Sequence, residues 1–361
     1  MAITLTSLTD LAAHGFDDII DVRSPAEFAD DHLPGAISLP VLDDAERARV
    51  GTIYKQVNPF TARKLGAALV ARNAALHLEG PLADRAGGWR PLVYCWRGGQ
   101  RSGSFATILA QIGWRVETLA GGYKAWRGLV VAALYDAPVP APVIVLDGNT
   151  GTGKTEILAR LALRGVQVID LEGLARHRGS LFGAMPGGQP SQRGFEGRLA
   201  MTLAALDPAR PVVVEAESAK IGDLRLPPGL WKAMQAAPRI AVTAPPAARA
   251  DYLARSYADL TADAARLAAI IGSLRPSHPA EAIARWQAQA AAGEFAALAC
   301  DLIERHYDPR YLRHRARGAT PLVELQAGRL DPQALDDLAA RVSACLPVLS
   351  GGSAPALASP A

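Results

Sequence analysis

The chain has 361 residues, of which half are apolar and a fifth are charged, and a net charge of +3, a composition typical of a globular protein of about two domains. Its apolar runs fall short of the ~18 residues that a membrane helix needs, and its first residues lack the basic and apolar regions of a signal peptide. The three cysteines, Cys95, Cys300 and Cys345, are too widely spaced for a disulfide framework or a structural zinc site, so we expect a cytoplasmic protein with free thiols.

Short apolar runs alternate with helical patterns up to about residue 240, which predicts an α/β architecture. The predicted strands are Asp18–Val22, Pro91–Tyr94, Val143–Asp147, Val166–Leu171, Val212–Glu215 and Ile240–Thr243. The proline-rich stretch YDAPVPAP stiffens the chain and marks a boundary between two domains. Strand signals vanish after about residue 247, where Ala-rich helical stretches such as Ala262–Ile271 and Ala280–Arg305 take over. The predicted divisions are a first domain (1–136), a linker (137–142), an α/β domain (143–247), a helical region (248–347) and a disordered tail (348–361).

A cysteine follows the strand Pro91–Tyr94, in the segment CWRGGQRS. A cysteine between a strand and a glycine-bearing loop that leads into a helix lies in a cradle of backbone N–H groups. This cradle, with Arg97 or Arg101, favours a thiolate over a thiol and suits a tetrahedral oxyanion. A buried structural cysteine is the alternative, but two arginines and two glycines within six residues favour a reactive thiol. Cys95, Arg97 and Arg101 are therefore the candidate catalytic residues.

Two flanking segments resemble the rhodanese-like family. The run IIDVRSPAEFADDHLPGAISLP (Ile19–Pro40) is similar to its amino-terminal signature, and GGYKAW (Gly121–Trp126) to its closing segment. The resemblance implies that the loop cysteine carries sulfur or selenium, and that Asp21, Arg23 and His32 are scaffold. The Cys-x5-Arg loop is one residue longer than the usual sulfurtransferase loop and resembles that of phosphatases related to rhodaneses. Phosphatase chemistry therefore remains an alternative for this domain alone.

A second motif, GNTGTGKT, fits G-x-x-x-x-G-K-[ST] and follows a predicted strand. The helical run EILARLALRG and the strand VQVIDL complete a βαβ unit, and only six lysines occur in the whole chain. In such a P-loop, glycines let backbone N–H groups approach a diphosphate, the lysine neutralises it, and the hydroxyl ligates Mg²⁺. The candidate diphosphate ligands are Gly148, Gly151, Gly153, Lys154 and Thr155, with Thr155 as the candidate Mg²⁺ ligand.

Acidic residues follow the next strands. The run VEAES brings Glu215 or Glu217 to the P-loop end of the sheet, like a Walker B carboxylate, and Asp170 ends the strand before it. The usual Walker B residue is Asp, and surface charge is the alternative for both glutamates. The basic triplet at 176–178 also follows the second strand of this domain and is a weaker candidate for the substrate zone.

A rhodanese-like segment followed by a P-loop, along nearly the whole chain, resembles the tRNA 2-selenouridine synthases. The matching blocks, in the family's order, are VGTIYKQ, LGAALVARN, YCWRGGQRSGS, GNTGTGKTEIL, DLEGLARHRGSLFG, QPSQ, VEAESAKIGDLRLP and HYDPRY. The fold class expected is α/β: an N-terminal rhodanese-like parallel-sheet domain, then a P-loop NTPase-like α/β domain with a helical C-terminal extension.

The resemblance implies a substrate and two steps. Enzymes of this family act on the wobble 2-thiouridine of tRNAs for Lys, Glu and Gln. They attach a geranyl group from geranyl diphosphate to the sulfur, and then replace that sulfur with selenium from selenophosphate. On this basis Cys95 carries selenium, and the P-loop holds geranyl diphosphate without nucleotide hydrolysis.

An arginine-rich segment near the carboxyl end, at 305–317, also holds two tyrosines and is the candidate tRNA contact. Its candidate residues are Arg310, Arg313, Arg315 and Arg317. A solvated helix face is the alternative, and Cys300 and Cys345 are predicted to lie in cores. Two other functions remain open for the chain: a phosphatase or sulfurtransferase fused to an NTPase with no RNA substrate, and a non-enzymatic nucleotide-binding module.

Overall fold

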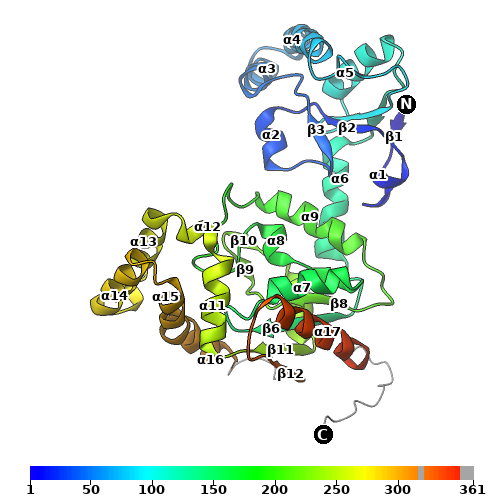
Figure 1. Ribbon diagram of the computed structural model, residues 1–361. Coiled ribbons are helices and arrows are strands. Elements are labelled where there is room, and N and C mark those ends of the chain that lie inside the picture. Colours follow the sequence, from blue (N-terminus) through cyan, green and yellow to red (C-terminus); the bar gives the residue numbers. More distant parts are fainter. Residues whose placement is uncertain (316–320, 350–361) are drawn as a thin grey trace. The chain divides into compact units, whose positions relative to one another are not determined.

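The computed structural model describes residues 1–315 and 321–349, which form two compact units (Figure 1). Unit 1 comprises Met1–Pro138 and Pro190–Ala205, and unit 2 comprises Val139–Gln189 and the described residues from Leu206 onward. Of the predicted disordered tail (348–361), residues 348 and 349 are instead the end of the helix α17 (Pro332–Leu349), and the rest lies outside the described residues. In the described part of the chain, no helix is long and apolar enough to cross a membrane.

Unit 1 is built on a five-stranded parallel sheet with the order β1-β5-β4-β2-β3. Its strands are β1 (Ala2–Ile3), β2 (Asp18–Asp21), β3 (Ala36–Ser38), β4 (Pro91–Tyr94) and β5 (Glu117–Leu119). All four residues of β4 are buried, as expected of a central strand in a parallel sheet. Because the strands are parallel, the loop that follows β4 lies at the carboxyl edge of the sheet. Because β4 is the central strand, this loop lies at the middle of that edge.

The helices of unit 1 are α1 (Asp10–Ala13), α2 (Pro25–Asp30), α3 (Asp44–Gln56), α4 (Pro59–Glu79), α5 (Gln100–Gln111), α6 (Gly122–Val131), the π-helical turn η1 (Ala132–Asp136) and α9 (Gln192–Ala204). The last of these is distant in sequence. It contacts α6 and η1, and its Glu196 pairs with Arg127 and accepts a 2.7 Å hydrogen bond from Tyr135. The division by contacts therefore differs from the contiguous domains predicted above, because α9 packs with α6 and η1 of unit 1.

Unit 2 contains a second five-stranded parallel sheet, in the order β12-β11-β6-β8-β7. Its strands are β6 (Val143–Gly148), β7 (Gln167–Ile169), β8 (Val212–Glu215), β11 (Arg239–Thr243) and β12 (Val323–Gln326), and a small antiparallel pair joins β9 (Lys220–Ile221) to β10 (Leu224–Arg225). The expectation that strands end near residue 247 was wrong, since β12 completes the sheet. The sequence did not reveal this strand because it is short and lies at the edge of the sheet, half-exposed, and its sequence VELQ has no apolar run.

The helices of unit 2 are α7 (Lys154–Leu163), α8 (Leu171–Ala175), α10 (Pro228–Ala236), α11 (Pro246–Ser256), α12 (Ala258–Thr261), α13 (Ala264–Ser273), the 3-10 turn η2 (Arg275–Ser277), α14 (Ala280–Ala291), α15 (Phe295–Leu302), the π-helical turn η3 (Ile303–Tyr307), α16 (Asp308–Arg315) and α17 (Pro332–Leu349). Helices α7 and α17 share one apolar core with the sheet, and α12 to α15 form a second core around Trp286. The single helix predicted over Ala280–Arg305 is interrupted at Gly293, whose φ of +72° ends α14.

Candidate functional site

The first site is the loop after β4. Cys95 is 4% exposed, and its Sγ accepts hydrogen bonds from the Gly99 backbone N–H at 3.3 Å and from the Ser102 hydroxyl at 3.2 Å. Burial alone would raise the pKa of the Cys95 thiol, but these bonds and the charge of Arg101 lower it below its ordinary value. The loop is therefore built to stabilise a thiolate.

The closing segment holds this loop from behind. The backbone N–H of Tyr123 donates to the Cys95 carbonyl at 2.9 Å, and that of Lys124 donates to Trp96 at 3.0 Å. Gly122 directly precedes them with a φ of +56°, and a Cβ there would collide with the Cys95 carbonyl oxygen. Only glycine fits at this position, so GGYKAW fixes the shape of the cysteine loop.

The two loop arginines take different positions. Arg97 is exposed, whereas Arg101 donates to Glu27 at 2.8 Å, and Arg47 pairs with the same carboxylate at 2.9 Å. Burial would raise the pKa of Glu27, but the two arginines lower it to about 2. A cavity of about 410 Å³ opens here, lined by Ala26, Glu27, Asp30, Arg47, Trp96, Arg101 and Arg193. The mouth of the cysteine loop is thus rich in guanidinium groups.

The signature residues make contacts that support the loop from inside the unit. Arg23 is buried, pairs with Asp21 at 2.6 Å, and lies over the ring of Tyr123 at 4.1 Å. The ring nitrogen Nδ1 of His32 lies 2.9 Å from the carbonyl oxygen of Phe28. Asp21, Arg23 and His32 therefore hold the scaffold and do not reach the thiol.

Replacing Ser102 with alanine is expected to raise the pKa of the Cys95 thiol, because the sulfur loses a hydrogen bond that favours its charged form. The rate of alkylation by iodoacetamide, measured against pH, then rises at higher pH than in the wild type, and at neutral pH alkylation is slower. Ser104→Ala, on the exposed side of the same helix, is the matched control. An unchanged alkylation profile in Ser102→Ala would mean that this hydroxyl does not tune the thiol.

The second site is the P-loop between β6 and α7. Gly153 caps α7 with a φ of +76°, and the Nζ of Lys154 donates to the Gly148 carbonyl at 2.9 Å. Burial acts to lower the pKa of Lys154, but Tyr311 and the neighbouring glutamates raise it above its ordinary value. The lysine is therefore a fixed positive charge beside a helix N-terminus, where an anion is favoured.

Three carboxyl groups lie beside the P-loop. Thr155 donates to Glu172 at 2.8 Å and lies 3.5 Å from Glu215, which accepts from the Glu172 backbone N–H at 2.7 Å. Burial and then the charge of Glu172 raise the pKa of Glu217 to about 8, and they raise that of Glu215 well above its ordinary value. These shifts favour the protonated forms of Glu215 and Glu217, and a protonated carboxyl group repels an incoming diphosphate less than a carboxylate does.

The candidate residues divide between the wall of a cavity and the layer behind it. The cavity measures about 490 Å³ and is lined by Thr150, Gly151, Thr152, Gly153, Lys154, Thr155, Glu156, Ala159, Glu172, Arg178, Gly179, Ser180, Glu217, Tyr252, Leu253, Ser256, Tyr257, Tyr307 and Tyr311. Asp170 instead caps α8 through a 2.7 Å bond from the Gly173 N–H, and Glu215 lies fully buried behind Thr155. The sequence did not single out Glu172, which lies in the first turn of α8, two residues after the candidate Asp170.

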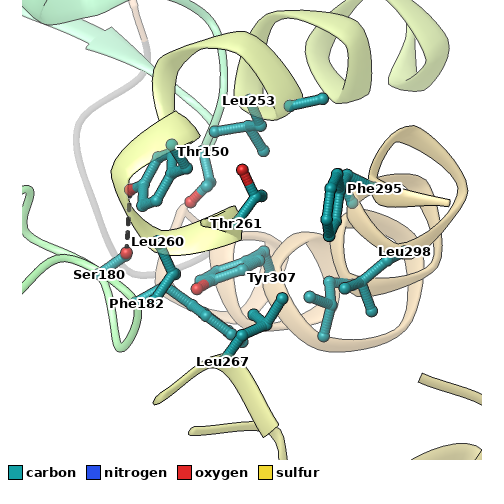
Figure 2. A pocket seen from close by; sticks show the side chains of 14 residues that line it. Thr150, Ser180, Phe182, Leu253, Leu260, Thr261, Leu267, Phe295, Leu298 and Tyr307 are labelled. Carbon is teal, nitrogen blue, oxygen red and sulfur yellow. Dashed lines mark hydrogen bonds between the residues drawn. The ribbon is translucent and has the colours of Figure 1, made fainter. Parts of the chain in front are cut away.

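A small apolar pocket of about 70 Å³ adjoins this cavity (Figure 2). It is lined by Thr150, Ser180, Phe182, Leu253, Ala254, Tyr257, Leu260, Thr261, Leu267, Phe295, Leu298, Ala299, Leu302 and Tyr307. Thr150, Ser180, Leu253, Tyr257 and Tyr307 line both spaces, and the Ser180 and Tyr257 hydroxyls lie 3.2 Å apart. Figure 2 shows side chains from separate helices converging on one space. The cavity beside the P-loop and the apolar pocket therefore share one wall.

The remaining candidates are less fully described. Arg310 contacts the His306 ring at 2.8 Å. Arg313 and Arg315 belong to α16, but their side chains, like the whole of Arg317, lie outside the described residues. A tRNA contact there stays a prediction. Cys300 and Cys345 are both half-buried.

Comparisons with known proteins find relatives of both parts of the chain. A rhodanese-like domain model matches residues 4–129, and the model of the tRNA 2-selenouridine synthase AAA domain matches residues 141–270. The tRNA 2-selenouridine synthase of Aeromonas salmonicida (strain A449) is 41% identical over 71% of this chain and 68% of its own length. That of Chromohalobacter salexigens is 40% identical over 67% of this chain and 65% of its own length, so the chain spans about two thirds of these relatives. The chain therefore belongs to the tRNA 2-selenouridine synthases, a family of tRNA-modifying enzymes.

Proposed function

We propose that this protein converts the wobble 2-thiouridine of tRNAs for Lys, Glu and Gln into 2-selenouridine in two steps. The first attaches a geranyl group from geranyl diphosphate to the sulfur, and the second replaces the geranylated sulfur with selenium that comes from selenophosphate. The family membership supports the overall conversion. The two anion-binding loops and the apolar pocket support this division into steps.

The apolar pocket beside the P-loop is the observation that carries the first step. Geranyl diphosphate has a charged head and a branched hydrocarbon tail, and the two adjoining spaces differ in the same way. The apolar pocket measures only about 70 Å³, so it would have to widen to hold the whole tail. The thiocarbonyl sulfur attacks the first carbon of the geranyl group, and the bond to the diphosphate oxygen breaks. The leaving diphosphate gains negative charge as this happens, and Lys154 and the backbone N–H groups of the P-loop stabilise that charge.

Hard oxygen donors near the P-loop also fit a magnesium ion. The Thr155 hydroxyl and the Glu172 carboxylate lie together at the cavity, and Mg²⁺ prefers such oxygen ligands together with substrate phosphates. Bound there, Mg²⁺ would supply further neutralisation of the diphosphate. Among the described residues no group of three or more His, Cys, Asp or Glu side chains has the arrangement of a protein-only metal site, so substrate oxygens would have to complete the coordination.

The second step belongs to the Cys95 loop. Alkylation turns the thiocarbonyl sulfur into a group that can leave as geranylthiol. The Cys95 thiolate, whose pKa is lowered, is suited to add at that ring carbon and displace geranylthiol. The selenium of selenophosphate, which is already at the selenide level, then displaces Cys95 from the carbon, and the phosphoryl group passes to water as phosphate, so no oxidant is needed. The surrounding guanidinium groups, Arg47, Arg101 and Arg193, suit an anionic donor such as selenophosphate.

The test is mass analysis of the nucleosides of thiolated tRNA after incubation with the protein. Geranyl diphosphate alone should yield geranylated thiouridine, and adding selenophosphate should yield selenouridine. If neither nucleoside forms, but the protein turns over thiosulfate or aryl phosphate and hydrolyses ATP or GTP, the chain is instead a rhodanese- or phosphatase-type enzyme fused to an NTPase.

Filling the apolar pocket is expected to weaken the use of geranyl diphosphate specifically. Leu298 is 4% exposed in the pocket wall, and Leu298→Trp should raise the Kd for geranyl diphosphate about tenfold or more, while inorganic diphosphate binds as in the wild type. Leu163→Trp, at a site 88% exposed, is the control for adding an indole. Phe295→Ala enlarges the same pocket and should shift preference toward the longer farnesyl diphosphate. If Leu298→Trp weakens the binding of geranyl diphosphate and of inorganic diphosphate equally, and Phe295→Ala does not change the preference between geranyl and farnesyl diphosphate, the pocket does not bind the geranyl tail.

A further inference from the structure

The helical hairpin α3–α4 of unit 1 has an unusual distribution of charge. Between Glu46 and Glu79 the chain has no acidic residue. The same stretch carries six basic residues: Arg47, Arg49, Lys55, Arg63, Lys64 and Arg72. Two of the six lysines of the whole protein lie on this hairpin. A one-signed surface of this kind attracts a polyanion.

Most of this charge is not neutralised within the protein. Arg47 and Arg72 pair with Glu27 and Glu46. The other four, Arg49, Lys55, Arg63 and Lys64, are exposed, and no carboxylate of the described residues lies within ion-pair distance of them. These four side chains are therefore available to phosphate groups.

Large apolar side chains lie among these charges. Phe60 is 75% exposed, Val57 is 64% exposed and Tyr54 is 51% exposed, at the turn where α3 ends and α4 begins. Exposed aromatic rings interleaved with basic residues are the arrangement on which unpaired bases stack. A double helix would not use these rings, because its bases are already stacked on each other.

A cavity of about 270 Å³ lies beneath the hairpin, close to the lower size of typical ligand pockets. It is lined by Leu42, Val50, Tyr54, Ala62, Arg63, Gly66, Ala67, Val70, Gln100, Arg101 and Ser104. The last three belong to the first turns of α5, the helix that starts at the end of the Cys95 loop. Tyr54 thus belongs both to the exposed surface and to a cavity that reaches this helix.

We propose that the α3–α4 hairpin binds a single-stranded loop of the substrate tRNA, with Lys55, Arg63 and Lys64 on its phosphates and Tyr54 and Phe60 stacked on its unpaired bases. The cavity beneath receives one base that has left the stack. This inference rests on the proposed function for the identity of the RNA, and it places RNA on unit 1 in addition to the arginine-rich segment near the carboxyl end.

The test compares tRNA binding by two triple variants of the full chain that lose the same charge. Lys55→Ala/Arg63→Ala/Lys64→Ala should raise the Kd for thiolated tRNA on the order of tenfold or more at moderate salt. It should also reduce the slope of log K against log salt by about 2, since each single-strand phosphate contact contributes ~0.7. The control, Arg198→Ala/Lys232→Ala/Arg275→Ala, removes three exposed charges elsewhere and should bind as the wild type does. If both triple variants weaken tRNA binding equally, the effect comes from the net charge of the protein and not from the hairpin, and the proposal is overturned.

The aromatic residues give a second measurement. Tyr54→Ala and Phe60→Ala should each weaken binding on the order of tenfold, and Tyr54→Phe should retain it because the ring remains. If the wild type modifies tRNA and all hairpin variants bind it normally, this inference fails while the proposed function stands. If the wild type itself neither binds nor modifies tRNA, the proposed function fails. Charge-dependent binding to phosphatidylglycerol vesicles without binding to tRNA would assign the hairpin to a membrane surface and overturn the inference.

Discussion

Lys154→Ala is expected to lower the rate of geranylation of thiolated tRNA about 100- to 1,000-fold, as the removal of one fixed group that stabilises developing negative charge typically does. The Nζ of Lys154 is held at the P-loop by the Gly148 carbonyl at 2.9 Å. In the first step the diphosphate leaves with an additional negative charge, and this ammonium group is the cation of the P-loop. The measurement is the yield of geranylated thiouridine, by mass analysis of nucleosides, over a time course with geranyl diphosphate.

Two further variants separate this effect from a loss of folding. Lys154→Met keeps most of the side-chain volume without the charge and should lose geranylation equally, with a melting temperature close to that of the wild type. Lys232→Ala removes an exposed lysine of α10 and should leave the rate unchanged. Geranylation that persists in a folded Lys154→Met protein would show that the P-loop is not the diphosphate site.

Cys95→Ala is expected to retain geranylation and to abolish selenouridine formation. In the proposed second step the thiol is the nucleophile, and its pKa is lowered by hydrogen bonds from Gly99 and Ser102. The P-loop, its carboxyl cluster and the apolar pocket are all built from residues of unit 2, whereas Cys95 belongs to unit 1. Geranylated tRNA should therefore accumulate when both geranyl diphosphate and selenophosphate are supplied.

The other cysteines provide the matched controls for this variant. Cys300→Ala and Cys345→Ala make the same chemical change at half-buried positions in helices, and both should form selenouridine normally. A Cys95→Ala protein that loses geranylation as completely as selenation would contradict the assignment of one step to each loop.

Both loops were predictable from the sequence because each is a contiguous motif. Cys95 to Ser102 and Gly148 to Thr155 follow single strands, and a strand, a turn and a helix N-terminus define each cradle locally. The long apolar strands were predicted for the same reason. The short strands β1, β3 and β5 have two or three residues each, and such lengths carry no pattern that distinguishes a strand from a loop.

The residues that the sequence did not reveal come from segments that only folding brings together. The apolar pocket takes Phe182 from a loop, Leu267 from α13 and Leu298 from α15, and each of these reads as an ordinary core residue in its own helix or loop. Arg193 lines the cavity at the mouth of the Cys95 loop because α9 packs with unit 1. Its position in the sequence, after the P-loop, gave no signal for this.

The central claim, that the P-loop serves only the first step and Cys95 the second, is tested most directly by bypassing the first step. Lys154→Ala is given selenophosphate and tRNA that already carries geranylated thiouridine, and the selenouridine formed is measured against the wild type. The account predicts that the variant forms selenouridine at close to the wild-type rate. A folded variant that forms none from this tRNA, while the wild type does, would contradict it.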